Sequence, residues 1–136
     1  MIYNKQPIDA LWDMTKGLMF NDDGTLKENG IPIYKEIMTE EPEDTPDSYI
    51  LLRSQVSDST TQYGDGKSLI READCDIILV SKGYAEDSSD LHNKNKELIR
   101  QHLKAQEVPF QEANLGYDET LKATQHTFYT WVYYNA

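Results

Sequence analysis

Residues 49–81 read YILLRSQVSDSTTQYGDGKSLIREADCDIILVS, and the pattern of this stretch decides the fold. Its two ends are rich in Ile, Leu and Val, which favour strands. Its middle is polar and contains Gly64 and Gly66. Two strand-forming runs joined by a polar, glycine-bearing segment indicate a β-hairpin. We predict strands at 49–56 and 69–80, with an exposed and mobile tip at 57–67.

The second strand of this hairpin changes character along its length. It begins with polar and apolar residues in alternation, and Glu72 and Asp74 fall on the side opposite Ala73 and Cys75. Residues 77–80 are apolar on both sides. This is typical of a strand that passes from solvent into the middle of a sheet.

Helices are predicted on either side of the hairpin along the chain. In residues 4–20 the apolar positions recur at helical spacing, and Asn4 and Pro7 suit a cap and a first turn. Residues 89–105 form a second amphipathic segment. Its buried face is predicted to carry Leu91, Asn95, Leu98, Ile99, His102 and Leu103.

Three further strands are predicted outside the hairpin. Residues 31–37 alternate, and Pro32 places them at an edge or a strand start. An acidic loop with two prolines follows at 38–48, and 108–113 is a short strand before a polar connection at 114–124. Residues 126–134 form the clearest strand, with Phe128, Val132 and Tyr134 on one side and Tyr129, Trp131 and Tyr133 on the other.

This order of elements predicts an α+β fold in a single domain, residues 1–136. We expect a mostly antiparallel β-sheet with a long hairpin and two main α-helices packed on one face. Since only one face can then meet the helices, the second aromatic side of 126–134 is expected to contact something else, such as another subunit.

Composition points to a soluble intracellular protein with no membrane segment and no disulfide. The 136 residues include 24 acids and 13 bases, for a net charge of −11, and a single cysteine. Binding DNA or RNA over a broad surface requires many Lys and Arg residues to neutralise phosphates. A nucleic-acid-binding function is therefore disfavoured.

No catalytic, cofactor or metal site is predicted. The run from Gly64 to Ser68 resembles the end of a phosphate-binding loop, but Thr61 stands where a glycine is needed and a strand follows instead of a helix. The turn at 21–24 lacks the oxygen ligands of a calcium loop. Cys75 lies between Asp74 and Asp76, which would raise its pKa, so it is interpreted as structural. A carboxylate pair at Asp74 and Asp76 is conceivable, but nothing nearby in the sequence offers a nucleophile. The chain is predicted not to be an enzyme.

The layout and several local sequences resemble the tail terminator (tail completion) proteins of long-tailed bacteriophages, a group of head–tail joining proteins. An N-terminal helix leads into IPIYKEI at 31–37 and an acidic loop, and 49–81 supplies the long hairpin. The helix SSDLHNKNKELIRQHLKAQ at 88–106 and the aromatic strand at 126–134 complete the match. The long acidic loop at 38–48 is a departure without an assigned role.

The resemblance implies a structural role without catalysis, cofactor or metal. Such proteins form a ring, typically a hexamer, on the head-proximal end of the tail tube, where they contact the tube protein and the head-completion protein. DNA passes through the ring without specific binding. The protein would be made in the host cytoplasm and lie in the virion neck. Candidate contacts to subunits or partners are Thr60, Gln62, Tyr63, Asp65 and Lys67 at the tip, and Tyr129, Trp131 and Tyr133 in the last strand.

Two other classes stay open. The charge of −11 suits an acidic inhibitor that mimics DNA, or another phage-encoded protein-binding module. Its acids are spread along the chain, with one cluster between Glu40 and Asp47, which weakens the DNA-mimic hypothesis. A small enzyme is the other class, and the sequence offers no convergent set of His, Cys or Ser in its favour.

Overall fold

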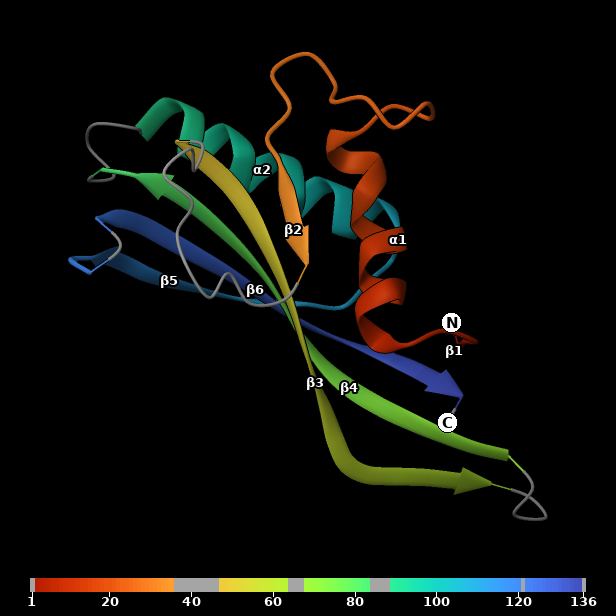
Figure 1. Ribbon diagram of the computed structural model, residues 1–136. Coiled ribbons are helices and arrows are strands. Elements are labelled where there is room, and N and C mark those ends of the chain that lie inside the picture. Colours follow the sequence, from red (N-terminus) through yellow and green to blue (C-terminus); the bar gives the residue numbers. More distant parts are fainter. Residues whose placement is uncertain (1, 36–46, 64–67, 84–88, 121, 136) are drawn as a thin grey trace.

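The computed structural model describes residues 2–35, 47–63, 68–83, 89–120 and 122–135 (Figure 1). The elements in chain order are β1 (Ile2–Tyr3), α1 (Pro7–Met19), β2 (Ile33–Lys35), β3 (Ser48–Tyr63), β4 (Ser68–Lys82), α2 (Ser89–Ala105), β5 (Gln111–Asp118) and β6 (Ala123–Asn135).

Within the described residues, six strands form one sheet in the order β1-β6-β4-β3-β2, and β5 pairs with β6 on the same edge as β1. The pairs β3–β4, β4–β6 and β5–β6 are antiparallel, while β1–β6 and β2–β3 are parallel. The predicted α+β fold with a mostly antiparallel sheet is confirmed.

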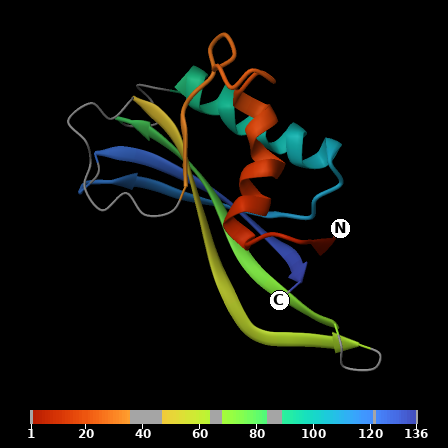
Figure 2. The same cartoon turned by 45° about the vertical axis from the view of Figure 1, so that its right-hand side comes forward.

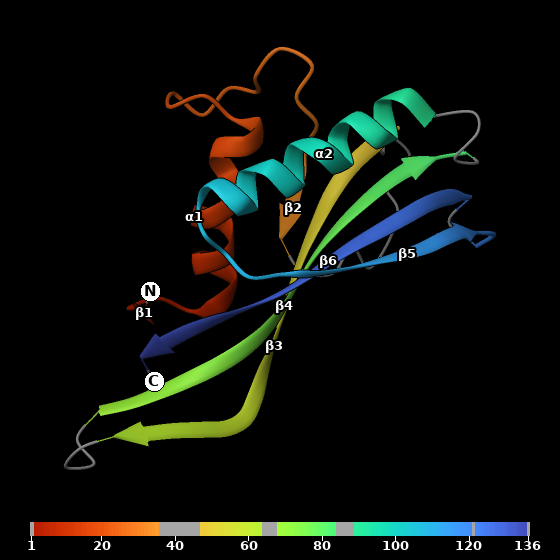
Figure 3. The ribbon, with the colours of Figure 1, turned by 180° about the vertical axis from the view of Figure 1, so that it is seen from behind.

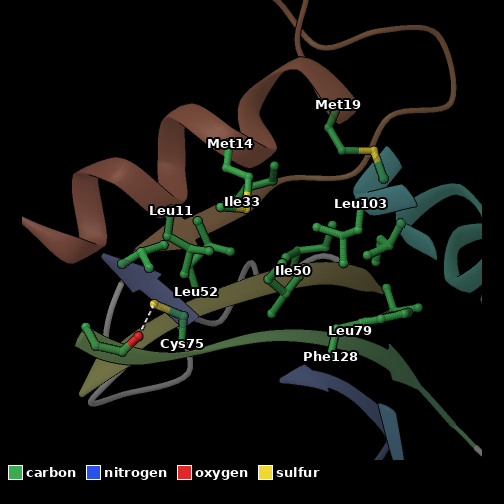
Figure 4. Close-up of a cluster of buried hydrophobic side chains, with 14 of the residues drawn as sticks. Leu11, Met14, Met19, Ile33, Ile50, Leu52, Cys75, Leu79, Leu103 and Phe128 are labelled. Carbon is green, nitrogen blue, oxygen red and sulfur yellow. Dashed lines mark hydrogen bonds between the residues drawn. The ribbon is translucent and has the colours of Figure 1, made fainter. Parts of the chain in front are cut away.

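Both helices lie on one face of the sheet. α2 crosses behind α1 in Figure 1 and in front of it in the reverse view of Figure 3. Their apolar sides and the facing sheet residues form the main core (Figure 4). Leu11 and Met14 of α1 pack over the sheet, and Ile99 and Leu103 of α2 complete the layer. Its largest sheet residues are Ile50, Leu52, Ile77, Leu79 and Phe128, all fully buried.

The first helix starts later than predicted. Asn4 does not cap it: the N-cap is Gln6, which makes no side-chain cap hydrogen bond, and Pro7 is the first helical residue. Pro7 suits this place because the first helical N–H groups have no partner within the helix. The side-chain amide of Asn135 instead donates a hydrogen bond to Asn4, which joins the segment after β1 to the end of β6.

The strand predicted at 31–37 is short and pairs in parallel. Only Ile33–Lys35 is strand within the described residues, and residues 36–46, which include most of the predicted acidic loop, lie outside them. Ile33 pairs with Ile50, and the amide of Ile50 donates to the carbonyl of Pro32 at 2.9 Å. Parallel strands need a long crossover connection, and the stretch from Glu36 to Asp47 provides its length.

The hairpin strands extend further than predicted. Residues 57–63 were expected in the tip, yet β3 continues to Tyr63 and pairs with β4 as far as Ser68. A register shift between Val56 and Thr60 accommodates the polar residues between them. A β-bulge of this kind bends a strand while pairing continues beyond it. Figures 1 and 2 show the distal hairpin bending and projecting past the helices.

The predicted polar connection at 114–124 is also wrong. The structure has strand at Gln111–Asp118, and β6 already begins at Ala123. Half of the residues of β5 are exposed and the others are partly buried, because β5 lies at the sheet edge, so its polarity resembles that of a loop. A second register shift, between Asn114 and Gly116, places Leu115 in solvent.

Phe128 and Tyr129 provide a direct test of the two faces of β6. Phe128 is fully buried under the helices, whereas Tyr129 is 40% exposed on the other face. We expect Phe128→Ala to lower the free energy of unfolding by about 3–5 kcal/mol, because it leaves a cavity in the core. Tyr129→Ala should cost about 1 kcal/mol or less. Urea denaturation of both variants measures this, and equal losses would contradict the assignment of faces.

Candidate interaction surface

The predicted contact residues of the hairpin lie in its distal part. Thr60, Gln62 and Tyr63 are in β3, where they pair with Arg71, Leu69 and Ser68 of β4. Asp65 and Lys67 lie outside the described residues. The backbone of β3 therefore carries three of the five predicted residues beyond the bulge.

The other predicted contacts form a row on the open face of the sheet, the one opposite the helices. Tyr129, Trp131 and Tyr133 alternate along β6 with the buried Phe128, Thr130 and Val132. Tyr129 is 40% exposed, Tyr133 is 37% exposed and Trp131 is half-buried. The structure brings these three side chains together on one accessible surface.

A row of acids runs beside them, and this proximity was not predicted from the sequence. Glu72, Asp74 and Asp76 lie directly across from Tyr133, Trp131 and Tyr129 in the β4–β6 pairing. We call these six residues the acid–aromatic face. The period-two pattern of each strand is visible in the sequence, but the register that sets one row against the other is not.

One carboxylate of this face has a partner of its own. Arg53 of β3 is the residue paired with Asp76, and its guanidinium lies 3.3 Å from the Asp76 carboxylate. The next rung has Gln55 opposite Asp74, and Asp74 makes no ion pair with a described residue. A hollow of about 280 Å³ lies here, lined by Arg53, Ser54, Gln55, Asp74 and Asp76.

The rest of the open face differs sharply from the acid–aromatic face. Toward the other end of the same strands, Tyr49, Ile78, Val80 and Ala123 are buried together in a second apolar cluster. Tyr34 of β2 stands edge-on to Tyr49, with ring centroids 5.7 Å apart. On the open face of β4 and β6, the exposed residues Asp74, Tyr129 and Tyr133 lie in the half that bears the acids, and Lys82 is exposed at the other end.

A larger cavity, of about 530 Å³, opens at the edge of β6. β5 pairs with β6 as far as Tyr129 and β1 pairs only at Tyr133 and Tyr134, so the edge between them has no described strand partner. Tyr3, Met14, segment 106–109 and residues 131–133 line the cavity. Glu107 is its single carboxylate, and its lining holds no nucleophile–base pair.

A buried polar cluster between α2 and the sheet has the elements of a catalytic dyad. Ser81 Oγ and His92 Nδ1 are hydrogen-bonded at 2.7 Å. Yet Ser81 is 1% exposed and His92 is 3% exposed, so a substrate cannot reach either side chain. Burial first, and then the nearby charges of Lys96 and His126, lower the pKa of His92 to about 4. The pair attaches α2 to β4 and is structural.

The same cluster continues into an ion-pair network at the sheet edge. His126 Nε2 lies 2.9 Å from a carboxylate oxygen of Glu112, and both nitrogens Nε and Nη2 of Arg100 also donate to Glu112. The hydrogen bond from Arg100 is the main reason that the pKa of Glu112 falls to about 2. Burial lowers the pKa of His126 despite this carboxylate. The network ties α2 to β5 and β6.

Cys75 is a core residue, as its sequence context predicted. It is 1% exposed, and its Sγ lies 3.7 Å from the carbonyl oxygen of Ala73 (Figure 4). Burial, followed by the charges of Asp76 and Asp74, raises the pKa of its thiol to about 12. A thiol held in its neutral form is a poor nucleophile and a poor metal ligand.

Neither a metal centre nor a membrane span is found in the part of the chain that the structure describes. No three His, Cys, Asp or Glu side chains converge there to hold a metal ion. The glycine-containing run before Ser68 leads into β4, a strand, where a phosphate loop would need a helix. No described helix is long and apolar enough to cross a bilayer.

The buried histidines make stability depend on pH. Because the folded-state pKa of His92 is about 4, below its usual 6.5, the unfolded chain binds a proton that the folded chain excludes. This contribution is fully present above about pH 6.5 and is lost as the pH falls toward 4, by up to about 3 kcal/mol. Urea denaturation at about pH 7 and about pH 4.5 measures the loss.

The matched variant for this test is His92→Gln, which keeps a polar group for Ser81 but takes up no proton. Its free energy of unfolding should fall less over the same pH interval. Some pH dependence will remain, because the pKa of His126 is also lowered. An equally steep fall in the variant would exclude His92 as the titrating group.

Comparison with protein families and with curated proteins gives no match from which a site could be transferred. No protein-family model matches the chain, and no curated protein matches it.

Proposed function

We propose that this protein is a bacteriophage structural protein that closes the head-proximal end of a long tail as a ring and forms the head–tail joining interface. The observation that carries the proposal is the β3–β4 hairpin, whose distal end projects beyond the helices and the rest of the sheet (Figure 2). A hairpin that projects in this way has the reach to contact a neighbour.

The outer edge of β3 supports subunit contact by main-chain pairing. β2 covers only Ile50–Leu52 of this strand, so no described strand pairs with the outer edge of residues 53–63. An uncovered edge of this length presents free N–H and C=O groups, which another chain can extend by strand addition. In a ring of identical subunits, the hairpin of one subunit can contact the uncovered β3 edge of the next, and the same contact repeats around the ring.

The charge of the chain supports a role beside DNA without binding to it. At a net charge of −11, phosphates are repelled from most of the surface. A ring through which DNA passes requires this behaviour. In the proposal six copies form the ring, their partners are the tail tube protein and the head-completion protein, and the assembled ring lies in the virion neck after synthesis in the host cytoplasm.

An acidic DNA mimic, or another protein-binding module of a phage, is the second candidate. The row of Glu72, Asp74 and Asp76 favours it, because these carboxylates repeat regularly along one strand. The row is short, and Arg53 already neutralises Asp76. A mimic would bind a DNA-binding protein in competition with DNA and would leave tail length unchanged, which separates the two candidates.

Charge reversal at the tip tests the ring proposal. In a phage whose own copy of the gene is replaced by the Lys67→Glu variant, we expect tails of irregular length that fail to join heads, seen by electron microscopy. The matched control is Lys94→Glu, the same charge change at an exposed position of α2. Both purified variants should unfold at the same urea concentration as the unmodified protein, since surface changes alter stability little.

Normal infectious particles from the Lys67→Glu phage would count against the tip as an assembly contact. Uniform tails in a phage that lacks the gene altogether would exclude the tail-closing role itself. Purified tails mixed with the protein provide an independent check, because a ring should become visible at one end only.

A further inference from the structure

We propose that the acid–aromatic face binds an extended basic segment of a partner protein. Arginine or lysine side chains of that segment would lie against Asp74 and Trp131 on one rung and against Glu72 and Tyr133 on the next. The inference stands on the geometry of β4 and β6, and it holds whether or not the protein closes a tail tube.

The two rows form a ladder whose spacing matches that of an extended chain. Each rung pairs one carboxylate with one aromatic ring across neighbouring strands, where Cβ atoms lie roughly 4.5–5.5 Å apart. Successive rungs follow every second residue, at roughly 6.8 Å. An extended partner repeats its own side chains at the same interval, so alternate basic residues would meet successive rungs.

Each rung offers two attractions to one cation. The carboxylate supplies charge, and an aromatic face within about 6 Å attracts a guanidinium or ammonium group as well. Tyr133 is 37% exposed, Trp131 is half-buried and Asp74 is exposed, so all three are accessible from the open face.

The first rung shows a guanidinium paired with one carboxylate of the acid row. Arg53 lies 3.3 Å from Asp76 and comes from β3, the neighbour of β4 on the side away from Tyr129. At the second rung, the β3 residue opposite Asp74 is the uncharged Gln55, and Asp74 has no described ion-pair partner. The hollow of about 280 Å³ beside Asp74, which Arg53, Ser54, Gln55 and Asp76 also line, leaves open space on the β3 side of the acid row.

Charge decides the occupant of this face. A second copy of the chain would bring further acids to it, since each copy carries −11, and a nucleic acid would bring phosphates. A purely apolar partner would bury Asp74 and Glu72 without a counter-charge, which is costly. A basic segment satisfies the carboxylates and covers the exposed rings.

The test uses the full-length protein and two acetylated, amidated peptides with the same composition. One alternates Arg and Thr, and the other has its Arg residues in one block at an end. We expect the alternating peptide to bind more tightly, to shift the backbone amide resonances of β4 and β6, and to lose affinity as salt is raised. Equal affinity for the two peptides would overturn the ladder.

Variants then assign the contact to this face. The double variant Glu72→Gln with Asp74→Asn removes both charges with little change of shape, and it should weaken binding by about tenfold or more. Glu119→Gln, a charge removal at an exposed residue of the β5–β6 turn, is the control and should change affinity less than about twofold. Trp131→Phe keeps a ring and should have an intermediate effect, with its fold checked by thermal unfolding.

Two outcomes would contradict the proposal. Equal weakening by Glu119→Gln would reduce the binding to general attraction between a basic peptide and an acidic protein. A concentration-dependent rise in mass by light scattering that the double variant abolishes would show that the face binds a second copy.

Discussion

The pairing of β4 with its two neighbours is the constraint on which the rest of the structure depends. β4 is hydrogen-bonded to β6 from Ile70 to Lys82 and to β3 along almost the same length. This double pairing determines which face of the sheet each of its side chains occupies. On one face it supplies Ala73, Cys75, Ile77 and Leu79 to the core beneath the helices. A slip of one residue would place those side chains in solvent and the carboxylates of Asp74 and Asp76 in the core.

This constraint also explains why the helices can occupy only one face. Ser81 and Phe128 turn toward α2, and the residues that alternate with them turn away. The buried Ser81–His92 contact and the Arg100–Glu112–His126 network then hold α2 against β4, β5 and β6 at defined points. These polar contacts fix where α2 lies on the sheet, because a buried polar group such as His92 is costly to leave without its partner.

Much of the fold is predictable from local patterns, and the failures have physical causes. The α2 segment, the hairpin and the two-sided character of β6 follow from helical spacing, strand-forming runs and aromatic alternation. β1 was missed because two residues carry no periodicity. β5 was predicted only in part, as 108–113, because the rest of this edge strand has the composition of a loop. The parallel pairing of β2 with β3 depends on the path of the long connection between them, and the sequence of a three-residue strand does not predict that path.

The candidate surface was half predictable for a related reason. The aromatic row is a property of one strand and can be read along 126–134, whereas the acid row becomes meaningful only once Asp74 is known to lie across from Trp131. Register is set by bulges, turn length and packing, and none of these is a local property of β4 or β6. The tip residues were predicted as contacts because they lie in a polar, glycine-bearing segment. Composition does not show that β3 continues to Tyr63, and this continuation places three of the predicted residues in a paired strand.

The burial of Cys75 has a practical consequence. It is the single cysteine of the chain, its thiol is shielded by the core, and its raised pKa keeps it protonated at neutral pH. Thiol reagents will modify it only when the layer of α1 and the sheet opens, so its labelling rate measures how often that layer opens under native conditions. Cysteines introduced on the surface can then carry dyes or cross-linkers without competition from the natural residue.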